Sequence, residues 1–158
     1  MKKYYSLILP LLLLLNISSC GYQLRGTEGV AFESISIIGG STSFVKILGK
    51  RLKQSGVKVQ KESSEKSLEI TNDTFTKKIL SLSSAGKIRE YQINYKISFR
   101  FKSQAGEWSN LINLEANRDF TYDDKNIIAK TEEETRLIVG MQKQLIRTII
   151  TQMSVQNK

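Results

Sequence analysis

Side chains able to do catalytic or metal chemistry are scarce in this sequence, which has no histidine and a single cysteine, Cys20. A nucleophile or a general base would have to come from a serine–lysine pair or a carboxylate pair, and the acidic residues cluster at Glu132–Glu134. Acidic residues in the first turns of a helix usually complement the helix dipole. One cysteine without histidine cannot build a soft metal site, and no glycine-rich phosphate loop is present. The sequence therefore predicts no catalytic residue, no metal site and no enzyme.

Cys20 follows a segment with the features of a secretory signal. Two lysines precede Tyr4–Leu15, a mostly apolar run that is well short of the ~20 residues a membrane-spanning helix requires. Ile17-Ser18-Ser19-Cys20 resembles the bacterial lipobox, in which the signal peptidase cuts before a cysteine that receives lipid. We expect residues 1–19 to be removed and residues 20–158 to form one domain, with N-acyl and S-diacylglycerol groups on Cys20.

Lipidation would be sufficient to anchor this domain, because each buried methylene contributes ~0.8 kcal/mol and a stable anchor takes two or more chains. The residue after Cys20 is Gly21 rather than the aspartate that resembles an inner-membrane retention signal, which favours the outer membrane. The alternative is that Cys20 is an unmodified thiol beyond an ordinary cleavage site.

The expected mature chain is basic. Without the two lysines of the signal it keeps 22 basic and 15 acidic side chains, a formal net charge of +7. An exported lipoprotein seldom meets nucleic acid, whereas lipopolysaccharide and phospholipid headgroups are the abundant anions around it. The charge therefore favours a phosphate-bearing lipid over nucleic acid as a partner; the alternative is charge that serves solubility alone.

The chain after the signal predicts a strand and then an amphipathic helix. Phe32–Ile38 alternates apolar and serine residues before two glycines. Ser41 or Ser43 can cap a helix that stops at Gly56. Its apolar residues fall at helical spacing: Phe44, Val45, Ile47, Leu48 and Leu52.

From Val57 to Tyr122 the apolar period changes to two, which predicts three further strands. The first runs from Leu68 to Leu82 with a bulge near Asn72–Thr74. The second is "YQINYKISFRF", whose aromatic side we expect in the core and whose other side we expect to be polar and mildly basic. The third spans Trp108–Tyr122. Turns are expected at 83–86 and 104–107.

A helix over about Asn126–Met153, capped by Asp123 or Asp124, completes the chain. The expected fold is α+β with the order β-α-β-β-β-α. It is a two-layer sandwich in which a four-stranded sheet carries two helices on one face.

Lys130 is unusual in that last helix, because a cation near a helix N-terminus opposes the helix dipole. Glu133 and Glu134 lie three and four residues further on, but lysine preceding glutamate is the weaker orientation and contributes only ~0.2–0.5 kcal/mol. Capture of a phosphate by Lys130 is therefore one interpretation, and a surface ion pair is the other.

Four motifs together resemble a known family. They are Cys20-Gly21-Tyr22-x-Leu24-Arg25, Glu90-Tyr91-Gln92, Arg118-Asp119-x-x-Tyr122-Asp123 and Ala129-Lys130-x-x-Glu133-Glu134-x-x-Leu137. In this order, and behind a lipobox, they are similar to the LptE family of lipopolysaccharide-assembly lipoproteins over essentially the whole expected mature chain.

The resemblance implies a non-enzymatic plug with no cofactor besides its lipid. LptE family members sit inside the outer-membrane barrel LptD, in an expected 1:1 complex that delivers lipopolysaccharide to the outer leaflet, and they bind lipopolysaccharide themselves. The implied binding surface combines Lys130 with a basic residue in the loop before Glu90. The family's loop arginine falls on Ser84, so Lys87 and Arg89 are expected to substitute for it, with Arg118 as a further contact.

Two alternatives stay open beside the plug. A scaffold lipoprotein without a ligand would use its charge only for solubility or headgroup adhesion. A structural lipoprotein of another outer-membrane complex would bind a different barrel. A salt-sensitive interaction with lipopolysaccharide separates the first from the plug, and the identity of the co-purifying barrel separates the second.

Overall fold

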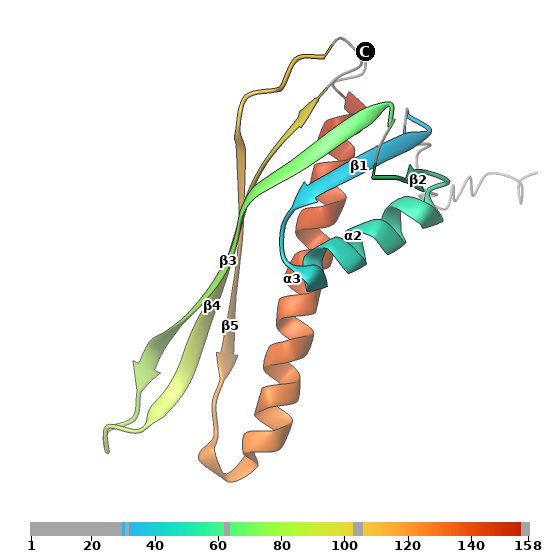
Figure 1. The fold of residues 1–158 in the computed structure, drawn as a ribbon. Helices are drawn as coiled ribbons and strands as arrows, with labels where there is room; N and C mark the ends of the chain where they lie inside the picture. The colour runs from blue at the N-terminus through green and yellow to red at the C-terminus, as the bar shows by residue number, and fades with distance from the viewer. Residues whose placement is uncertain (1–29, 31, 62–63, 103–105, 156–158) are drawn as a thin grey trace, which may run out of the picture.

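The structure is a computed structural model that describes residues 30, 32–61, 64–102 and 106–155. The expected signal peptide and Cys20 lie outside these residues, as do residues 104 and 105 of the predicted second turn. Figure 1 shows one sheet with both helices on the same side. The element order is β1 (Ser34–Gly39), α2 (Thr42–Gln54), β2 (Lys58–Val59), β3 (Lys66–Leu82), β4 (Ile88–Lys102), β5 (Ile112–Thr121), the 3-10 helix η2 (Asp124–Asn126) and α3 (Ile127–Val155).

The sheet has five strands in the order β2-β1-β3-β4-β5, so the prediction of four strands was wrong. The additional strand, β2, pairs in parallel with β1, and the N–H of Lys58 donates to the carbonyl of Glu33 at 2.8 Å. A strand of two residues cannot show an alternation of apolar and polar side chains, so no sequence pattern marks it. The α+β class and the placement of both helices on one face are confirmed.

The two helices begin close to where they were predicted. Ser41 caps α2 by accepting a hydrogen bond from the N–H of Phe44 at 3.3 Å, and the helix ends two residues before Gly56, whose φ is +82°. α3 follows η2, whose cap is Asp123. The 29 residues of α3 make it about 43 Å long at 1.5 Å per residue, long enough to lie along the whole sheet (Figure 1).

β1 ends where a glycine is required. Gly39 has a φ of +74°, and a Cβ atom there would lie 2.3 Å from the carbonyl oxygen of Ile70, its partner on β3. Beyond this pair β3 loses its neighbour on that side, and its register with β4 shifts between Ile70 and Asn72. The predicted bulge is thereby confirmed one residue earlier than expected, and two further shifts, between Ile79 and Ser81 and between Ser81 and Leu82, were not predicted.

Past this point only three strands continue, and we call them the distal extension. It consists of Asn72–Leu82 of β3, Ile88–Ser98 of β4 and Asn113–Thr121 of β5. Figure 1 shows that α3 accompanies the extension while α2 covers only the five-stranded part. The residues at the far end of the molecule are therefore held by α3 and by the two hairpin pairings alone.

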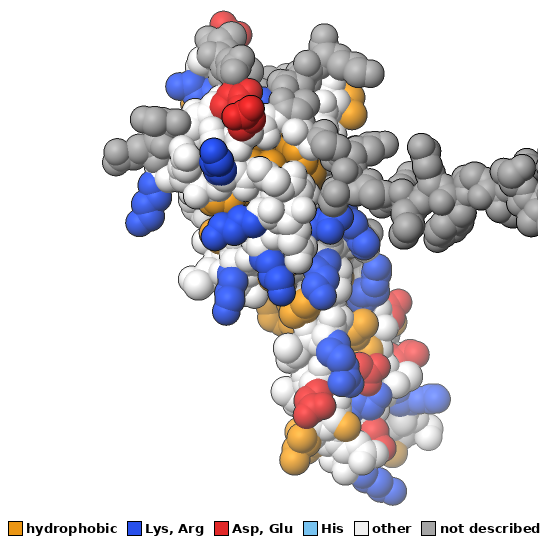
Figure 2. All heavy atoms as spheres, turned by 90° about the vertical axis from the view of Figure 1, so that its right-hand side faces the viewer, with side chains coloured by type: hydrophobic (Ala, Val, Ile, Leu, Met, Phe, Trp, Pro, Cys, Tyr) orange, Lys and Arg blue, Asp and Glu red, His pale blue; other side chains and the backbone are white. Residues whose placement is uncertain are grey.

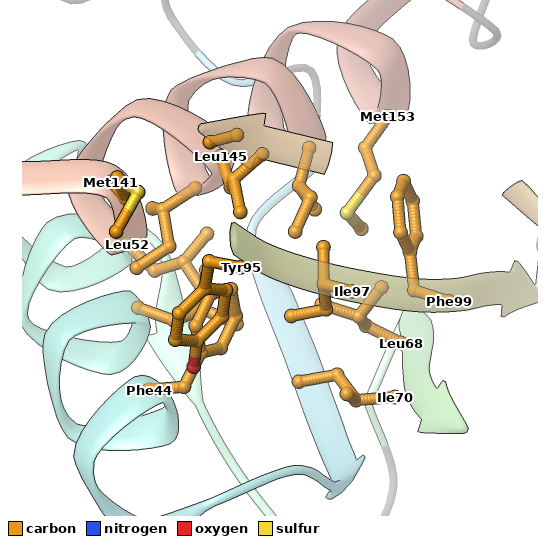
Figure 3. Packing of buried hydrophobic residues seen from close by; sticks show 14 of the residues in the cluster. Phe44, Leu52, Leu68, Ile70, Tyr95, Ile97, Phe99, Met141, Leu145 and Met153 are labelled. Carbon is orange, nitrogen blue, oxygen red and sulfur yellow. The ribbon is translucent and has the colours of Figure 1, made fainter. Parts of the chain in front are cut away.

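The buried core lies between the sheet and the two helices (Figure 3), and it continues into the distal extension at Ile93, Ala116 and Phe120. Three of the four aromatic residues predicted for it on β4, Tyr95, Phe99 and Phe101, are buried. The fourth, Tyr91, lies nearer the far end of the distal extension and is half-buried, with its ring stacked on that of Phe120.

A polar network crosses the core at the point where β1 ends. The hydroxyl of Tyr95 donates to Asp73, which follows the β3 bulge, and accepts from the amide Nε2 of Gln142 on α3 at 2.9 Å. The other oxygen of Asp73 accepts the N–H of Ser41, the cap of α2, at 2.8 Å. Burial, with help from Asp73, raises the pKa of Tyr95 to about 12. The network therefore connects β3, β4, α2 and α3 through one neutral hydroxyl.

Replacing this hydroxyl tests the network. In Tyr95→Phe, the amide of Gln142, only 3% exposed, loses its acceptor, so we expect the free energy of unfolding to fall by about 1–3 kcal/mol. The control is Tyr122→Phe, because the Tyr122 hydroxyl makes no hydrogen bond within the described part of the chain. Urea unfolding followed by circular dichroism measures both variants, and equal losses would show that the network adds nothing.

The wild type and Tyr95→Phe should also differ in how their free energy of unfolding depends on pH. The pKa of Tyr95 is higher in the folded than in the unfolded chain. Its neutral hydroxyl therefore contributes its full stabilisation below about pH 10, the ordinary pKa of tyrosine. That contribution is lost as the pH rises through the folded value of about 12. The difference in stability between the wild type and Tyr95→Phe should therefore shrink over this range.

Candidate functional site

The end of the distal extension brings together the β3–β4 turn, the last residues of β5 and the start of α3. The turn is closed by Ser83, whose N–H donates to the carbonyl of Lys87 at 2.7 Å. β4 and β5 are joined there by a 2.7 Å hydrogen bond from the N–H of Tyr122 to the carbonyl of Arg89. Asp123 then caps η2 by accepting the N–H of Lys125 at 3.0 Å. This hydrogen bond, with smaller effects from the neighbouring cations, holds the pKa of Asp123 below its ordinary value.

Lys130 is fixed at this end by two contacts. Its Nζ atom lies 3.1 Å from the hydroxyl of Thr121 and 2.8 Å from Oε2 of Glu133, and its side chain is 18% exposed. The ion pair that was one of two interpretations is thus formed. An ammonium group has three N–H donors, so two contacts leave one donor for an oxygen from outside the protein.

Lys87 and Arg89 lie at the same end of the sheet as Lys130. Arg89 is the backbone partner of Tyr122, and Tyr122 follows the threonine that Lys130 contacts. Both basic side chains are exposed and form no ion pair with the described residues. Ser84, the position of the family's loop arginine, is in the turn just before them. The structure therefore places three of the four predicted binding residues at one end.

Arg118 is placed differently. It lies on β5, three residues before Thr121, and its guanidinium donates to the side-chain oxygen of Gln144 on α3 and to the carbonyl of Asn117, each at 2.6 Å. The hydrogen bond to Gln144 joins β5 to the middle of α3. Arg118 is therefore engaged in packing away from the group formed by Lys87, Arg89 and Lys130.

A lysine that the sequence analysis did not single out lies beside this group. Lys77 of β3 pairs with Glu134 of α3 at 2.5 Å. Its Nζ atom also lies 4.2 Å from the centre of the Tyr91 ring, with Phe120 and Tyr122 nearby. The alternation of β3 places Lys77 on the apolar side between Phe75 and Ile79, so a cation on an apolar face was the signal that could have identified it.

Consecutive glutamates of α3 thus hold two cations from different elements. Glu133 binds Lys130 of its own helix, and Glu134 binds Lys77 of β3. The pair of Glu134 with Lys77, together with the contact of Lys130 with Thr121 of β5, fixes the first turns of α3 against the distal extension, where no second helix covers the sheet. Lys87 and Arg89, at the same end, form no ion pair with any described residue.

The outer face of the sheet is polar but not basic, contrary to expectation. Acidic residues from the neighbouring strands meet the polar side chains of β4: Asp119 accepts from Gln92 at 3.0 Å, and Glu69 pairs with Arg100. Glu115 accepts from Asn94, which lowers its pKa below the ordinary value. The prediction considered β4 by itself, whereas the pairing of β3 and β5 with it decides the charge of the face.

Within the described ranges, no three acidic, cysteine or histidine side chains gather as metal ligands would. A search of the same ranges finds no helix with the length and hydropathy needed to cross a membrane. The fold defines an α+β domain with a mixed sheet and both helices on one face.

This domain belongs to the LptE family, described as Lipopolysaccharide-assembly, whose family model matches residues 30–153. The resemblance inferred from the four motifs is therefore confirmed. Membership supports a role as a lipopolysaccharide-assembly lipoprotein rather than as an enzyme. A comparison with curated proteins finds no match.

Solved structures share the fold. The solution structure of an uncharacterized lipoprotein B from Nitrosomonas europaea is 28% identical, covers 87% of this chain and 92% of its own, and has a TM-score of 0.71. The rare lipoprotein B from Shewanella oneidensis is 22% identical over 79% of this chain and 96% of its own, with a TM-score of 0.70. A minor lipoprotein from Acinetobacter baumannii is 18% identical over 81% and 95%, with a TM-score of 0.65. The last two show likeness in fold alone.

The role of Lys77 in holding α3 is testable. Lys77→Met removes the ion pair with Glu134 and the cation–π contacts, so we expect a loss of about 1 kcal/mol in the free energy of unfolding. Lys78→Met is the matched control, since Lys78 is exposed and makes no ion pair with any described residue. Chemical denaturation compares the two, and a control that loses as much as Lys77→Met would contradict the assignment.

Proposed function

We propose that this protein is an outer-membrane lipoprotein that binds lipopolysaccharide and acts as the plug and assembly partner of the LptD barrel. The observation that carries the proposal is the LptE family match over residues 30–153. The arrangement of Lys130, Lys87 and Arg89 at one exposed end adds a physical route to binding.

Phosphates of lipid A or the core would meet these three cations. Lys130 has one ammonium donor left after its contacts with Thr121 and Glu133. Arg89 offers a guanidinium fork suited to two phosphate oxygens, and Lys87 adds a point charge. Arg118 contributes by holding β5 to α3 through Gln144 rather than by direct contact. No covalent bond changes in this process.

Apolar side chains at the same end fit the acyl part of such a ligand. Large hydrophobic residues are exposed there on the last part of β3 and on the first turn of α3: Ile79, Leu80, Leu82, Ile127 and Ile128. Exposed apolar groups gathered beside charged ones are typical of interaction surfaces. A lipid with phosphates and acyl chains would satisfy both kinds of side chain.

The outer face of the sheet supports the barrel part of the proposal. Its side chains form ladders of amides and paired charges, such as Gln92 with Asp119 and Ser98 with Asn113 at 2.6 Å. A polar, solvent-facing sheet on which the β4 cations Lys96 and Arg100 are paired with acids can lie against the polar inside of a barrel. Triacylated Cys20 would tether the domain on the periplasmic side of the outer membrane.

Lipopolysaccharide binding should depend on Lys130. We expect Lys130→Glu to weaken capture of lipopolysaccharide by about tenfold or more, because a charge-assisted hydrogen bond is replaced by repulsion. Arg136→Glu is the control: it makes the same charge change on α3 at an exposed position paired only with Glu132. Salt titration of the capture assay should weaken the wild type as well. Equal losses in the two variants would reject a specific role for Lys130.

Barrel association should survive this substitution. Tagged, lipidated protein purified from detergent-solubilised outer membranes should bring down one large β-barrel in near-equal amount, with or without Lys130→Glu. Mass spectrometry identifies the barrel and measures the acyl groups on Cys20. Recovery of a different complex would favour a structural lipoprotein without a ligand, and loss of the barrel together with lipopolysaccharide would mean that one surface serves both partners.

A further inference from the structure

A second basic surface lies on the helix side of the molecule, away from the distal end. α2 and α3 enclose a groove of about 330 Å³ between them. We call it the basic groove, and its charged lining consists of Lys50 and Arg51 from α2 and Lys143 and Arg147 from α3. Lys143 is 13 residues along α3 from Lys130, which is about 20 Å at 1.5 Å per residue.

The four cations of the basic groove have no acidic partner. None of them forms an ion pair within the part of the chain that the structure describes, and no acidic side chain lines the groove. Figure 2 shows a band of Lys and Arg side chains across the middle of this face, with the acidic side chains of the view above and below the band. The cations at the distal end differ, because Lys130 and Lys77 each have a glutamate.

Helix stability explains only part of this concentration of charge. Arg51 lies in the last turn of α2, where a cation favours the helix dipole. Lys143 and Arg147 are in the middle of α3 and four residues apart, a spacing at which like charges repel. Two pairs of cations facing one groove add to that repulsion, and a bound anion would remove it.

The floor of the groove is apolar. Ile47 of α2 is half-buried and Ile146 of α3 is buried between the cations. A free phosphate ion would gain nothing from this floor, whereas a phosphate attached to glycerol and acyl chains would cover it. Lysine and arginine also place their aliphatic stems along apolar surface while the charged ends meet the anion.

We propose that the basic groove binds the phosphate headgroup of an anionic phospholipid, separately from the lipopolysaccharide site at Lys130. The charged ends of Lys50, Arg51, Lys143 and Arg147 surround the phosphate, and the isoleucines meet the adjoining apolar part of the lipid. The inference rests on the groove alone and does not require the proposed function to be correct.

Binding can be measured on the full lipidated protein in a neutral detergent, by isothermal titration calorimetry with dihexanoyl phosphatidic acid. The test variant is Lys143→Gln with Arg147→Gln. The matched control is Lys78→Gln with Lys96→Gln, which removes the same charge from the opposite, outer face of the sheet. Circular dichroism melting confirms that both variants are folded.

We expect phosphatidic acid to bind the wild type and the control alike and the groove variant at least tenfold more weakly. Dihexanoyl phosphatidylcholine, which carries no net charge, should not bind at the groove. Equal weakening in both variants would assign the effect to net charge and overturn the proposal. If inorganic phosphate bound as tightly as phosphatidic acid, the groove would be a site for free phosphate, and the proposal of a phospholipid ligand would be rejected.

Lys130→Glu separates this inference from the proposed function. It should leave phosphatidic acid binding unchanged while it reduces capture of lipopolysaccharide. If Lys130→Glu removes phosphatidic acid binding, the lipid binds at the distal end and the groove proposal fails. If it affects neither ligand while the groove variant still loses phosphatidic acid, the groove proposal stands and the proposed site at Lys130 fails.

Discussion

The hydroxyl of Tyr95 lies where β1 stops and the sheet narrows from five strands to three, and the layers of the fold meet through it. It donates to Asp73 just after the β3 bulge and accepts from Gln142 on α3, while Asp73 also receives the N–H of the α2 cap. Buried polar groups are stable only when each is paired. The bulge, the start of α2 and the rotation of α3 are therefore fixed relative to one another, because a shift of any one would leave a buried donor or acceptor unpaired.

Everything beyond this junction depends on α3. The distal extension has no second helix over it, and an ion pair and hydrogen bonds add to the apolar packing that joins it to α3. Glu133 and Glu134 hold Lys130 and Lys77, and Gln144 holds Arg118. A long, narrow end fixed in this way exposes apolar side chains that a compact core would have buried, which suits a surface that meets partners.

The basic charge of the chain is divided into three electrostatic environments by the fold. On the outer face of the sheet, acids from β3 and β5 neutralise the cations of β4. At the distal end, glutamates of α3 hold two lysines and leave Lys87 and Arg89 unpaired. In the basic groove all four cations lack acidic partners among the described residues. Net charge alone shows none of this, because pairing depends on which strands and helices become neighbours.

The sequence by itself determined the features that depend on local periodicity and capping. The alternation in β4, the serine cap of α2 and the apolar stripe of α3 each follow from residues close together in the chain. Motif spacing likewise identified the family that the match over residues 30–153 confirms. Only the tertiary structure decided the fifth strand, the aromatic surroundings of Lys77 and the basic groove. These features join residues far apart in the sequence, and their contacts exist only after β1 has paired with β2 and α3 has packed along the sheet.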